Sequence, residues 1–575
     1  MIVVGFESYM KLDLRRDNWP VDQLKPDATE KIAWQIRGAY IELITTLGQH
    51  RRGDVDWWVT SLASRNTYIC PLYLRLCKLM LVFDLHEKGR LPDEVVTDST
   101  ALAGIIKQHL GGALKVTLVR NKGMFAKSLD YCSRYAAAFY HATFQYLCSL
   151  MWLKKRKLPA DGAILVDIFI SSDNMIENKI DDRYYPGMTE VLEESQRKNF
   201  FYTPTHYKVK NYPAHFRKLN RCRDRFLLKE DVLTLADYLY ALMHPLRLRR
   251  PAGKVGFFGI DIGNLVREAL SETISNSGSI EGLLRYRFAR RLKKLDFRPG
   301  KIIEWFENQE VDHGAIAGWR KFFPELEVVG YQGFLSSPHY FSSIPIEQEQ
   351  EYQLLPTRIV VIGENSVDSV KEFAPNLEVK TGPAFRFSSL WNEIEITRDR
   401  EGFNILAALP IHFRESSKII DMLAGAIKIN RGLSSVIIFV KPHPTWKAVD
   451  VRRLLSGREF EYELLSSSFD DALAVSDLIV SAASSVCAYA IARAVPCVVV
   501  GTPGSLLENS IHKDVDSRLW KICYLAEELA DAVEYYTAYG PEQKDELRIA
   551  AEAFRAVQFE PVNRESVYDF IGFGG

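Results

Sequence analysis

The chain has 575 residues, of which 47% are hydrophobic and 25% charged, the balance of an ordinary soluble globular protein. Lys and Arg total 73, equal to the 73 Asp and Glu, so the composition argues against a nucleic-acid-binding protein, which would carry a basic excess. The length is too great for one compact domain, and the eight Cys form no C-x-x-C pair, which argues against a zinc ribbon or a disulfide scaffold.

The N-terminal half alternates short apolar runs with longer stretches of helical periodicity. Strands spaced by helices predict parallel sheets with crossover connections, an α/β fold. The predicted strands cover residues 56–61, 94–97, 115–120, 163–170, 199–203, 301–307, 327–331 and 358–363. Between the last three and the others lies a mostly helical stretch, about 206–298, with a strand only at 255–260. We expect residues 1–390 to form a Rossmann-like domain with this helical insertion.

The chain after about residue 391 has the most regular pattern. Strands are predicted at 403–409, 436–440, 478–480 and 497–500, with helices between them at 416–429, 469–475 and 486–494. This order predicts a second doubly wound parallel sheet over residues 391–545, reached through a charged linker at 393–401. Residues 546–575 are expected to form a C-terminal helix that packs back on the first domain.

Two parallel-sheet domains place a cleft between the carboxyl ends of their strands, where such sheets bind ligands. Lys441-Pro-His443-Pro directly follows one predicted strand of the second domain. The two prolines end the strand and hold the histidine at the sheet edge, where it can donate a hydrogen bond to a phosphate and the lysine adds positive charge. The alternative is a structural proline turn.

A second signal follows the strand at 478–480. Ser484 and Ser485 stand at the predicted start of the helix at 486–494. A helix N-terminus favours an anion through its free N–H groups and its dipole, and two hydroxyls add donors. The alternative is that Ser485 only caps the helix.

Together the K-P-H-P and Ser-Ser motifs resemble the C-terminal domain of GT-B glycosyltransferases, most closely the sialyltransferase-like and Kdo-transferase-like enzymes of bacterial capsule and O-antigen biosynthesis. The resemblance covers residues 400–505 and implies that Lys441, His443, Ser484 and Ser485 hold the donor nucleotide. It implies transfer of a sugar from a nucleotide donor, with a CMP-activated ulosonic acid favoured, to a surface polysaccharide or lipid-linked glycan. UDP- or GDP-sugars, CDP-glycerol, an epimerase or hydrolase, and a non-catalytic assembly protein remain alternatives.

The first domain is expected to supply the acceptor site and a general base. Glu307 ends a hydrophobic strand and is followed by Asn308 and Gln309, so it is predicted to face the cleft and to take the proton of an acceptor hydroxyl. The alternative is a solvated glutamate at a strand end. Weaker cleft candidates share a position in a loop after a predicted strand: Arg65, Asn66, Gln332 and His339.

No cofactor and no metal are expected. Asp54 and Asp56 form a D-x-D string, but it precedes a predicted strand rather than following one, and no G-x-G-x-x-G or Walker loop follows a strand. A basic n-region followed by an apolar segment is missing at the N-terminus, so a cytoplasmic location is expected.

Two segments predict contact with the inner face of the cytoplasmic membrane. Residues 206–254 carry 12 Lys and Arg against 4 Asp and Glu, and residues 285–301 carry 8 against 1. Basic amphipathic segments are attracted to anionic lipid, and the alternative is an ordinary solvated helix face. The apolar run at 136–153 is interrupted by His141 and Gln145 and is interpreted as a buried or surface-docked helix.

Overall fold

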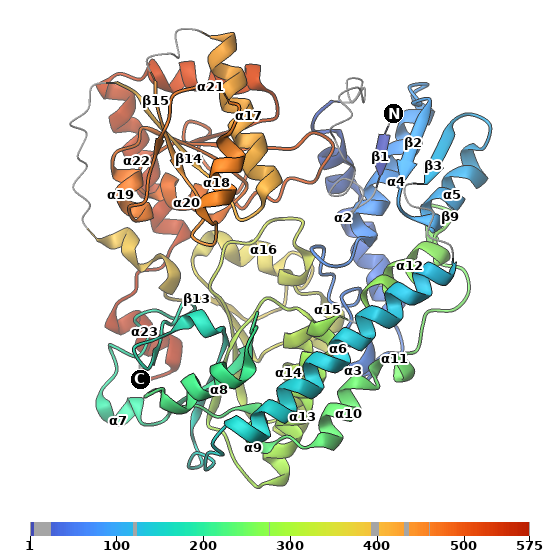
Figure 1. The fold of residues 1–575 in the computed structure, drawn as a ribbon, viewed down its shortest axis with the longest axis vertical. Helices are drawn as coiled ribbons and strands as arrows, with labels where there is room; N and C mark the ends of the chain where they lie inside the picture. Colours follow the sequence, from blue (N-terminus) through green and yellow to red (C-terminus); the bar gives the residue numbers. More distant parts are fainter. Residues whose placement is uncertain are drawn as a thin grey trace.

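The computed structural model contains two six-stranded sheets and one three-stranded sheet, all fully parallel (Figure 1). It describes residues 2–4, 25–118, 124–274, 276–392, 402–430, 436–458 and 460–573. For residues 2–4 and 124–131 it describes only the backbone. The predicted linker at 393–401 lies outside the described residues.

The larger sheet of the N-terminal part has the strand order β13-β12-β11-β10-β4-β7. Its strands are β4 (Ile164–Ile170), β7 (Phe200–His206), β10 (Lys301–Trp305), β11 (Glu327–Gln332), β12 (Arg358–Val361) and β13 (Val379–Thr381). In chain order this is the 2-1-3-4-5-6 arrangement of a doubly wound sheet, and the order reverses between β4 and β10. Ile302 pairs with Leu165 and with Val328, which sets the register at that point.

The C-terminal sheet has the order β16-β15-β14-β17-β18-β19. Its strands are β14 (Asn404–Ala408), β15 (Ile437–Lys441), β16 (Glu463–Leu464), β17 (Leu478–Ala482), β18 (Cys497–Val500) and β19 (Trp520–Cys523). This is the 3-2-1-4-5-6 order of the Rossmann fold, and it reverses between β14 and β17. Its crossover helices are α17 (Phe413–Ile429), α18 (Ala448–Leu455), α19 (Phe469–Ala474) and α20 (Ser485–Ala492).

The first strands form a sheet of their own rather than joining the larger one. β1 (Ile2–Val4), β2 (Glu94–Thr97) and β3 (Lys115–Leu118) pair in that order. This sheet packs with α2 (Ala28–Gly48), α4 (Leu72–Glu87), α5 (Thr100–Leu110) and α12 (Gly263–Thr273) around a separate apolar core. The N-terminal part therefore contains two sheets where the sequence predicted one.

The stretch between β7 and β10 is helical, as predicted. Its helices are α8 (Tyr212–Arg221), α9 (Lys229–Val232), α10 (Leu235–Leu242), α11 (His244–Arg247), α12 and α13 (Ser277–Lys294). The strand predicted at 255–260 is only a hairpin of two-residue strands, β8 (Gly256–Phe257) and β9 (Ile260–Asp261). α13 and α14 (Glu310–Phe322) bury Leu283, Phe288 and Trp319 against the sheet.

The strand predicted at 56–61 is wrong. Residues Val55–Trp58 form the short helix α3, because the Asp54 carboxylate accepts the backbone N–H of Trp57 at 3.3 Å and caps it. This helical turn places Trp57 and Trp58 in the core, where both are fully buried. Tertiary packing therefore overrides the strand propensity of tryptophan and valine.

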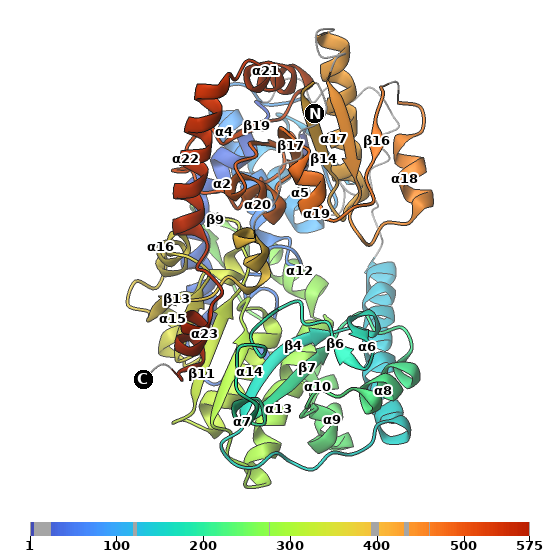
Figure 2. The ribbon, with the colours of Figure 1, turned by 90° about the vertical axis from the view of Figure 1, so that its left-hand side faces the viewer.

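The last three helices run from the C-terminal sheet to the N-terminal one (Figure 2). They are α21 (Ala526–Thr537), α22 (Pro541–Gln558) and α23 (Arg564–Ile571). Glu560 makes a parallel bridge to Pro383, and the Arg358 guanidinium donates to the Phe570 carbonyl at 3.0 Å. The end of the chain thus ties the two sheets together. The remaining helices are α6 (Met124–Trp152), α7 (Glu194–Arg197), α15 (Glu347–Glu351) and α16 (Val367–Lys371).

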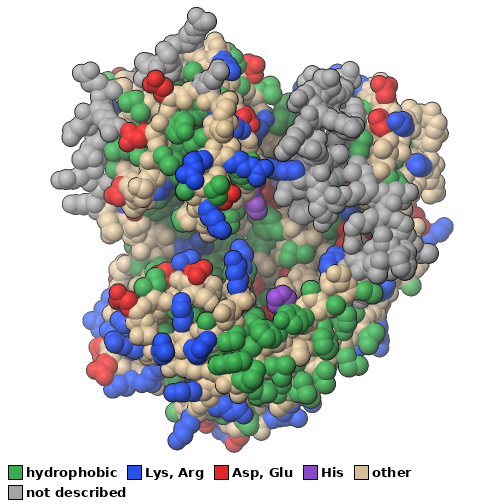
Figure 3. All heavy atoms as spheres, viewed as in Figure 1, with side chains coloured by type: hydrophobic (Ala, Val, Ile, Leu, Met, Phe, Trp, Pro, Cys, Tyr) green, Lys and Arg blue, Asp and Glu red, His purple; other side chains and the backbone are tan. Residues whose placement is uncertain are grey.

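The predicted fold class is confirmed by this topology: two Rossmann-like doubly wound parallel sheets in two domains, with a helical insertion in the first, which is the GT-B architecture. The two lobes face each other across a hollow that opens on the face shown in Figure 3.

Candidate active site between two parallel sheets

A cavity of about 450 Å³ lies at the carboxyl edge of the C-terminal sheet, where the strand order reverses between β14 and β17. Ala408, at the end of β14, and Ser481, near the end of β17, form its floor. The two sequence motifs both reach it: the lining residues include Lys441, His443, Ser484 and Ser485. Separate crossovers therefore bring the imidazole and the two hydroxyls to one pocket at the place where such sheets bind ligands.

The turn after β15 fixes the tautomer of His443. The backbone N–H of Thr445 donates to Nδ1 of His443 at 3.2 Å, so Nδ1 is the acceptor and the ring hydrogen is assigned to Nε2. Partial burial, and then the positive charge of Lys208, lower the pKa of His443 below its usual value. A neutral imidazole that presents Nε2–H is a hydrogen-bond donor suited to a phosphate oxygen. Lys208 belongs to the N-terminal part, just after β7, so its influence on His443 acts across the cleft.

Ser484 is the N-cap residue of α20, and its side chain makes no capping hydrogen bond to the helix. A helix leaves its first N–H groups without intrahelical partners, and their positive field favours an anion. The capping residue is thus Ser484 rather than Ser485. Ser485 is exposed, and both residues line the cavity.

Lys441 ends β15 and lines the same cavity. Its ammonium donates to the Ser467 carbonyl at the rim. Partial burial lowers the pKa of Lys441, and the nearby Asp471 acts in the opposite direction. The lysine contributes positive charge while anchored to the rim.

Arg386 is a site residue that the sequence reasoning missed. It lines both the 450 Å³ cavity and an adjoining cavity of about 180 Å³ between the two lobes, and its guanidinium lies 5.7 Å from the ring of Trp305 in the N-terminal sheet. The available signal was its place four residues after Gly382, in the Gly-Pro turn that leads toward the second domain. An exposed cation there adds positive potential to the cleft.

Glu508 lies in the adjoining cavity, which Ser484 and Ser485 also line. Burial raises the pKa of Glu508, and the Ser337 hydroxyl donates to its carboxylate at 2.5 Å. The 180 Å³ cavity therefore combines an acid that burial makes easier to protonate with the Arg386 cation.

A third cavity, about 310 Å³, lies at the carboxyl edge of the N-terminal sheet. Phe169 of β4 and Trp305 of β10 line it, so it too sits where the strand order reverses. Tyr184, Tyr207 and Val311 add further apolar surface, and Glu307 and Gln309 supply polar groups. An apolar and aromatic pocket with a few convergent polar groups is typical of a ligand site.

Three donors hold the Glu307 carboxylate at this cavity. The indole N–H of Trp305 donates to Oε1 at 2.8 Å, and the Gln309 amide and the Tyr340 hydroxyl donate to Oε2 at 2.6 and 3.1 Å. Hydrogen bonds of this kind fix the orientation of the carboxylate. Gln309 was a predicted cleft residue, and it lines the cavity beside Glu307.

The turn that presents Glu307 depends on Asn308. Its φ of 55° lies in the left-handed region, which asparagine tolerates better than most residues. The Asn308 side chain is fully buried and donates to Glu349 at 3.1 Å, so it supports the loop from below and does not reach the cleft. Glu349 in turn accepts two hydrogen bonds from Arg65, at 2.8 and 3.0 Å.

Two buried carboxyl groups lie at the third cavity, and one of them, Asp312, lines it. Asp312 accepts the backbone N–H groups of Glu307 and Gln309 at 3.0 and 2.9 Å, and Glu304 precedes Trp305 in β10. Burial raises the pKa of both groups well above the usual range. Asp312 thus fixes the Glu307–Gln309 turn through its backbone.

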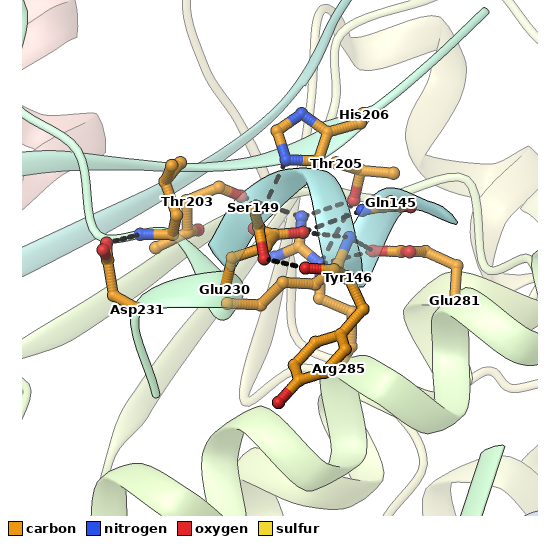
Figure 4. A network of polar contacts seen from close by, with 12 residues as sticks. Gln145, Tyr146, Ser149, Thr203, Thr205, His206, Glu230, Asp231, Glu281 and Arg285 are labelled. Carbon is orange, nitrogen blue, oxygen red and sulfur yellow. Dashed lines mark hydrogen bonds and ion pairs between the residues drawn. The ribbon is translucent and has the colours of Figure 1, made fainter. Parts of the chain in front are cut away.

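A buried polar network lies beside β4 and β7, the strands next to this cavity (Figure 4). Arg285 of α13 pairs with Asp167 of β4 and donates to the Thr203 carbonyl of β7 at 2.8 Å. Glu230 of α9 accepts from Gln145 of α6 at 2.7 Å and lies 3.3 Å from the ring of His206. Burial raises the pKa of Asp167 to about 6 despite its ion pair with Arg285. The network joins α6, α9 and α13 to the strand ends that carry Phe169 and Tyr207.

Four other predicted cleft residues are buried elsewhere, and the expectation that they line the cleft is wrong. Arg65 is fully buried against Glu349, and Asn66 donates to Glu310 at 3.2 Å. Gln332 donates to the Ser343 carbonyl at 2.8 Å, and His339 lies 2.7 Å from Glu30 of α2. The loops after these elements fold inward because the small N-terminal sheet and its helices pack over them, which the sequence pattern does not show.

Four of the eight basic residues at 285–301 form ion pairs with acids inside the fold. Arg285 pairs with Asp167, Arg287 and Arg291 share Asp237, and Lys301 pairs with Glu327. These side chains neutralise acids within the fold, Lys293 and Lys294 stay exposed, and contact of the segment with a membrane stays a prediction.

Among the described residues, no helix has the length and apolar character that crossing a membrane requires. The same part of the chain holds no group of three or more His, Cys, Asp or Glu side chains placed to bind a metal. Asp54 instead caps α3, and Asp56 pairs with Arg247.

No family model matches the sequence, and the search of curated proteins returned no match. Solved structures with a similar course of the chain include the N-terminal domain of Candida albicans trehalose-6-phosphate phosphatase, at 11% identity and a TM-score of 0.42, covering 73% of this chain and 98% of that one. UDP-GlcNAc 2-epimerase from Neisseria meningitidis, bound to UDP-GlcNAc, matches at 11% and 0.39 over 72% and 98%. A glycosyltransferase from Rickettsia africae matches at 10% and 0.40 over 72% and 98%.

Proposed function

We propose that the protein is a metal-independent glycosyltransferase that moves a sugar from a nucleotide donor to a surface polysaccharide or lipid-linked glycan. One observation carries the proposal. His443 and the Ser484–Ser485 helix end, supplied by different crossovers, line one cavity at the switch point of the C-terminal sheet, and Glu307 lines a second at the switch point of the facing sheet.

The C-terminal cavity offers three kinds of positive group to a nucleotide phosphate. They are the Nε2–H of His443, the Lys441 ammonium and the N-terminus of α20 with its two hydroxyls. Each stabilises the negative charge that grows on the phosphate as its bond to the anomeric carbon breaks, which lowers the barrier by electrostatic stabilisation. The bonding electrons leave with the nucleotide.

Glu307 supplies the base on the opposite side. It takes the proton of the acceptor hydroxyl while that oxygen forms the new bond to the anomeric carbon. Trp305, Gln309 and Tyr340 hold its carboxylate in one orientation before the substrate binds. The aromatic side chains of the cavity exclude water from the base and reduce hydrolysis of the donor.

Arg386 supports a donor sugar that carries a carboxylate, such as a CMP-activated ulosonic acid. It lies at the junction between the nucleotide cavity and the 180 Å³ cavity, where the sugar would sit. Glu508 opposes an acidic sugar when ionised, but burial raises its pKa and weakens that repulsion. A neutral sugar on UDP or GDP would instead use Glu508 as a hydrogen-bond acceptor.

A thermal-unfolding screen with CMP, CDP, UDP and GDP tests the proposal. A nucleotide at 100 times its Kd stabilises the folded state by about 2.7 kcal/mol, and the same concentration should stabilise the His443→Ala variant by only about 0.4–1.4 kcal/mol. If none of the four shifts the wild-type transition, the proposal fails. Incubation of the corresponding sugar nucleotide without acceptor then separates a transferase from an epimerase or hydrolase, since only the latter two release or convert the sugar.

A further inference from the structure

We propose that the outer face of α6, together with α10 and α11, docks on a membrane surface that contains anionic lipid. The proposal rests on an exposed apolar surface with a basic end, and it holds whether or not the protein transfers a sugar. We call this surface the α6 face; its apolar members are Phe139, Tyr140, Leu147, Leu150 and Met151 of α6, Leu235 and Leu239 of α10, and Met243 and Leu246 beside and within α11.

The exposed apolar residues of α6 recur at helical spacing. Tyr140, Leu147 and Met151 follow one another along one side of the helix, and Met151 is 62% exposed. The opposite side buries Ala142, Gln145 and Cys148 against the protein. The helix thus buries small and polar side chains along this side while five large apolar ones stay exposed, which is unusual for a surface helix.

The neighbouring helix pair extends the same surface. The rings of Tyr146 in α6 and Tyr238 in α10 lie 4.8 Å apart, which places the two helices side by side. Along α10 and α11 the exposed apolar side chains again share one side, and Leu246 is 78% exposed. Figure 3 shows the hydrophobic side chains gathered on the lower lobe, over the region where Figure 1 places α6 and α10. An apolar patch of this extent marks an interaction surface.

The charges next to the α6 face indicate what binds to it. Residues 132–158 and 212–221 contain no Asp or Glu. At the end of α6 the Asn220 amide of α8 donates to the Trp152 carbonyl at 2.7 Å, so the basic residues after α6 and those of α8 form one cluster. Its exposed members include Lys154, Lys155, Lys157, Arg217 and Arg221.

None of these five forms an ion pair within the described chain, in contrast to Arg285, Arg287 and Arg291. Apolar side chains next to unpaired cations match the interface of an anionic bilayer, where the apolar groups enter the acyl boundary and the cations contact phosphates. Binding of a soluble acidic protein would account for the cations but not for the many exposed apolar side chains.

The position of the α6 face fits a substrate with a lipid anchor, an implication that does rest on the proposed function. α8 packs on α6 and follows β7 after a short loop, and that loop begins with Tyr207, which lines the cavity of Glu307. A bilayer on the α6 face would therefore lie one helix away from the acceptor cavity.

Flotation of the full chain with vesicles tests the proposal. We expect it to float with an equal mixture of phosphatidylcholine and phosphatidylglycerol, weakly with phosphatidylcholine alone, and less as salt rises. Leu150→Glu with Met151→Glu should reduce partitioning by at least about tenfold, because two apolar groups no longer enter the interface. The matched control is Ile549→Glu with Val557→Glu, two exposed apolar positions on α22, which should float like the wild type.

A pair of charge variants separates this face from 285–301, one of the two basic segments predicted from the sequence. Lys154→Glu with Lys155→Glu should abolish the preference for phosphatidylglycerol, whereas Lys293→Glu with Lys294→Glu, exposed on α13, should not. Absence of flotation with the mixed vesicles, or equal loss in both charge variants, would overturn the proposal. So would a concentration-dependent dimer that the Leu150 and Met151 changes disrupt. Nucleotide-induced stabilisation of each variant checks its fold and reports on the active site independently.

Discussion

The two sheets place their cavities at equivalent points of their topology but build them differently. In the C-terminal sheet the site depends on backbone: a proline-bounded turn presents His443, and a helix N-terminus presents Ser484 and Ser485. In the N-terminal sheet it depends on buried side chains, since Trp305, Gln309 and Tyr340 orient Glu307. A site made from backbone tolerates changes of side chain, whereas one made from side chains is sensitive to each of them, including Tyr340, which lies 33 residues from Glu307.

The largest effect is expected for Glu307→Gln. The amide keeps the size of the side chain but cannot accept a proton, so sugar transfer should fall by about 10²- to 10⁴-fold. Nucleotide affinity should not change, because the C-terminal cavity is untouched. Turnover and nucleotide Kd, measured on the same preparation, check both halves. Unchanged turnover would remove Glu307 as the base.

Glu349→Gln should test the buried support of the Glu307 loop. Glu349 is fully buried and bonded to Arg65, His313 and Asn308, so loss of its charge leaves Arg65 uncompensated and should lower the free energy of unfolding by about 3–5 kcal/mol. Glu347→Gln, an exposed position on the same helix, is the control. Denaturant unfolding measures the difference.

The same group predicts a pH dependence. The Arg65 guanidinium and His313 lower the pKa of Glu349 to about 2, against burial, which acts to raise it. A lowered pKa contributes stability above the unfolded-state value, and that contribution is lost as the pH falls from about 4.5 toward 2. Unfolding curves across this range should converge for Glu349→Gln and the wild type; a constant gap would contradict the assignment.

His443→Ala should weaken nucleotide binding by about ten- to a hundredfold, the range for a hydrogen bond to a charged group. Because its pKa is lowered, His443 is neutral at pH 7, and affinity should rise as the pH falls and the ring becomes charged. The alanine variant should lose this rise. Calorimetric titration at several pH values measures both effects, with His512→Ala, an exposed histidine of the same lobe, as control.

The smallest effect is expected for Ser484→Ala combined with Ser485→Ala. Each hydroxyl is expected to contribute about 0.5 kcal/mol, the lower end for a hydrogen bond, because the helix N–H groups stay in place, so nucleotide affinity should fall only about fivefold. A loss as large as that of His443→Ala would mean that the hydroxyls, not the helix end, dominate the site, and the contrast between the two sheets would weaken.

Sequence reasoning reached the C-terminal site because its determinants are consecutive. Lys441, His443, Ser484 and Ser485 each follow a recognisable strand directly, so strand prediction alone places them at one sheet edge. Glu307 could be predicted from the sequence for the same reason. Arg386 was missed because it follows no strand of the cleft directly, and Arg65 was misplaced because its loop was thought to follow a strand that is in fact α3.

The amino-acid pattern determined the two parallel sheets, their helical insertion and the residues at the strand ends, since periodicity and turn chemistry act over a few neighbouring positions. Only the tertiary structure decided which charged side chains form ion pairs inside the fold and which are exposed. Arg285 and Lys154 look alike along the chain, but Asp167 pairs with the first, and no acid within the described ranges pairs with the second. Such pairing depends on segments more than a hundred residues apart, and no local pattern records it.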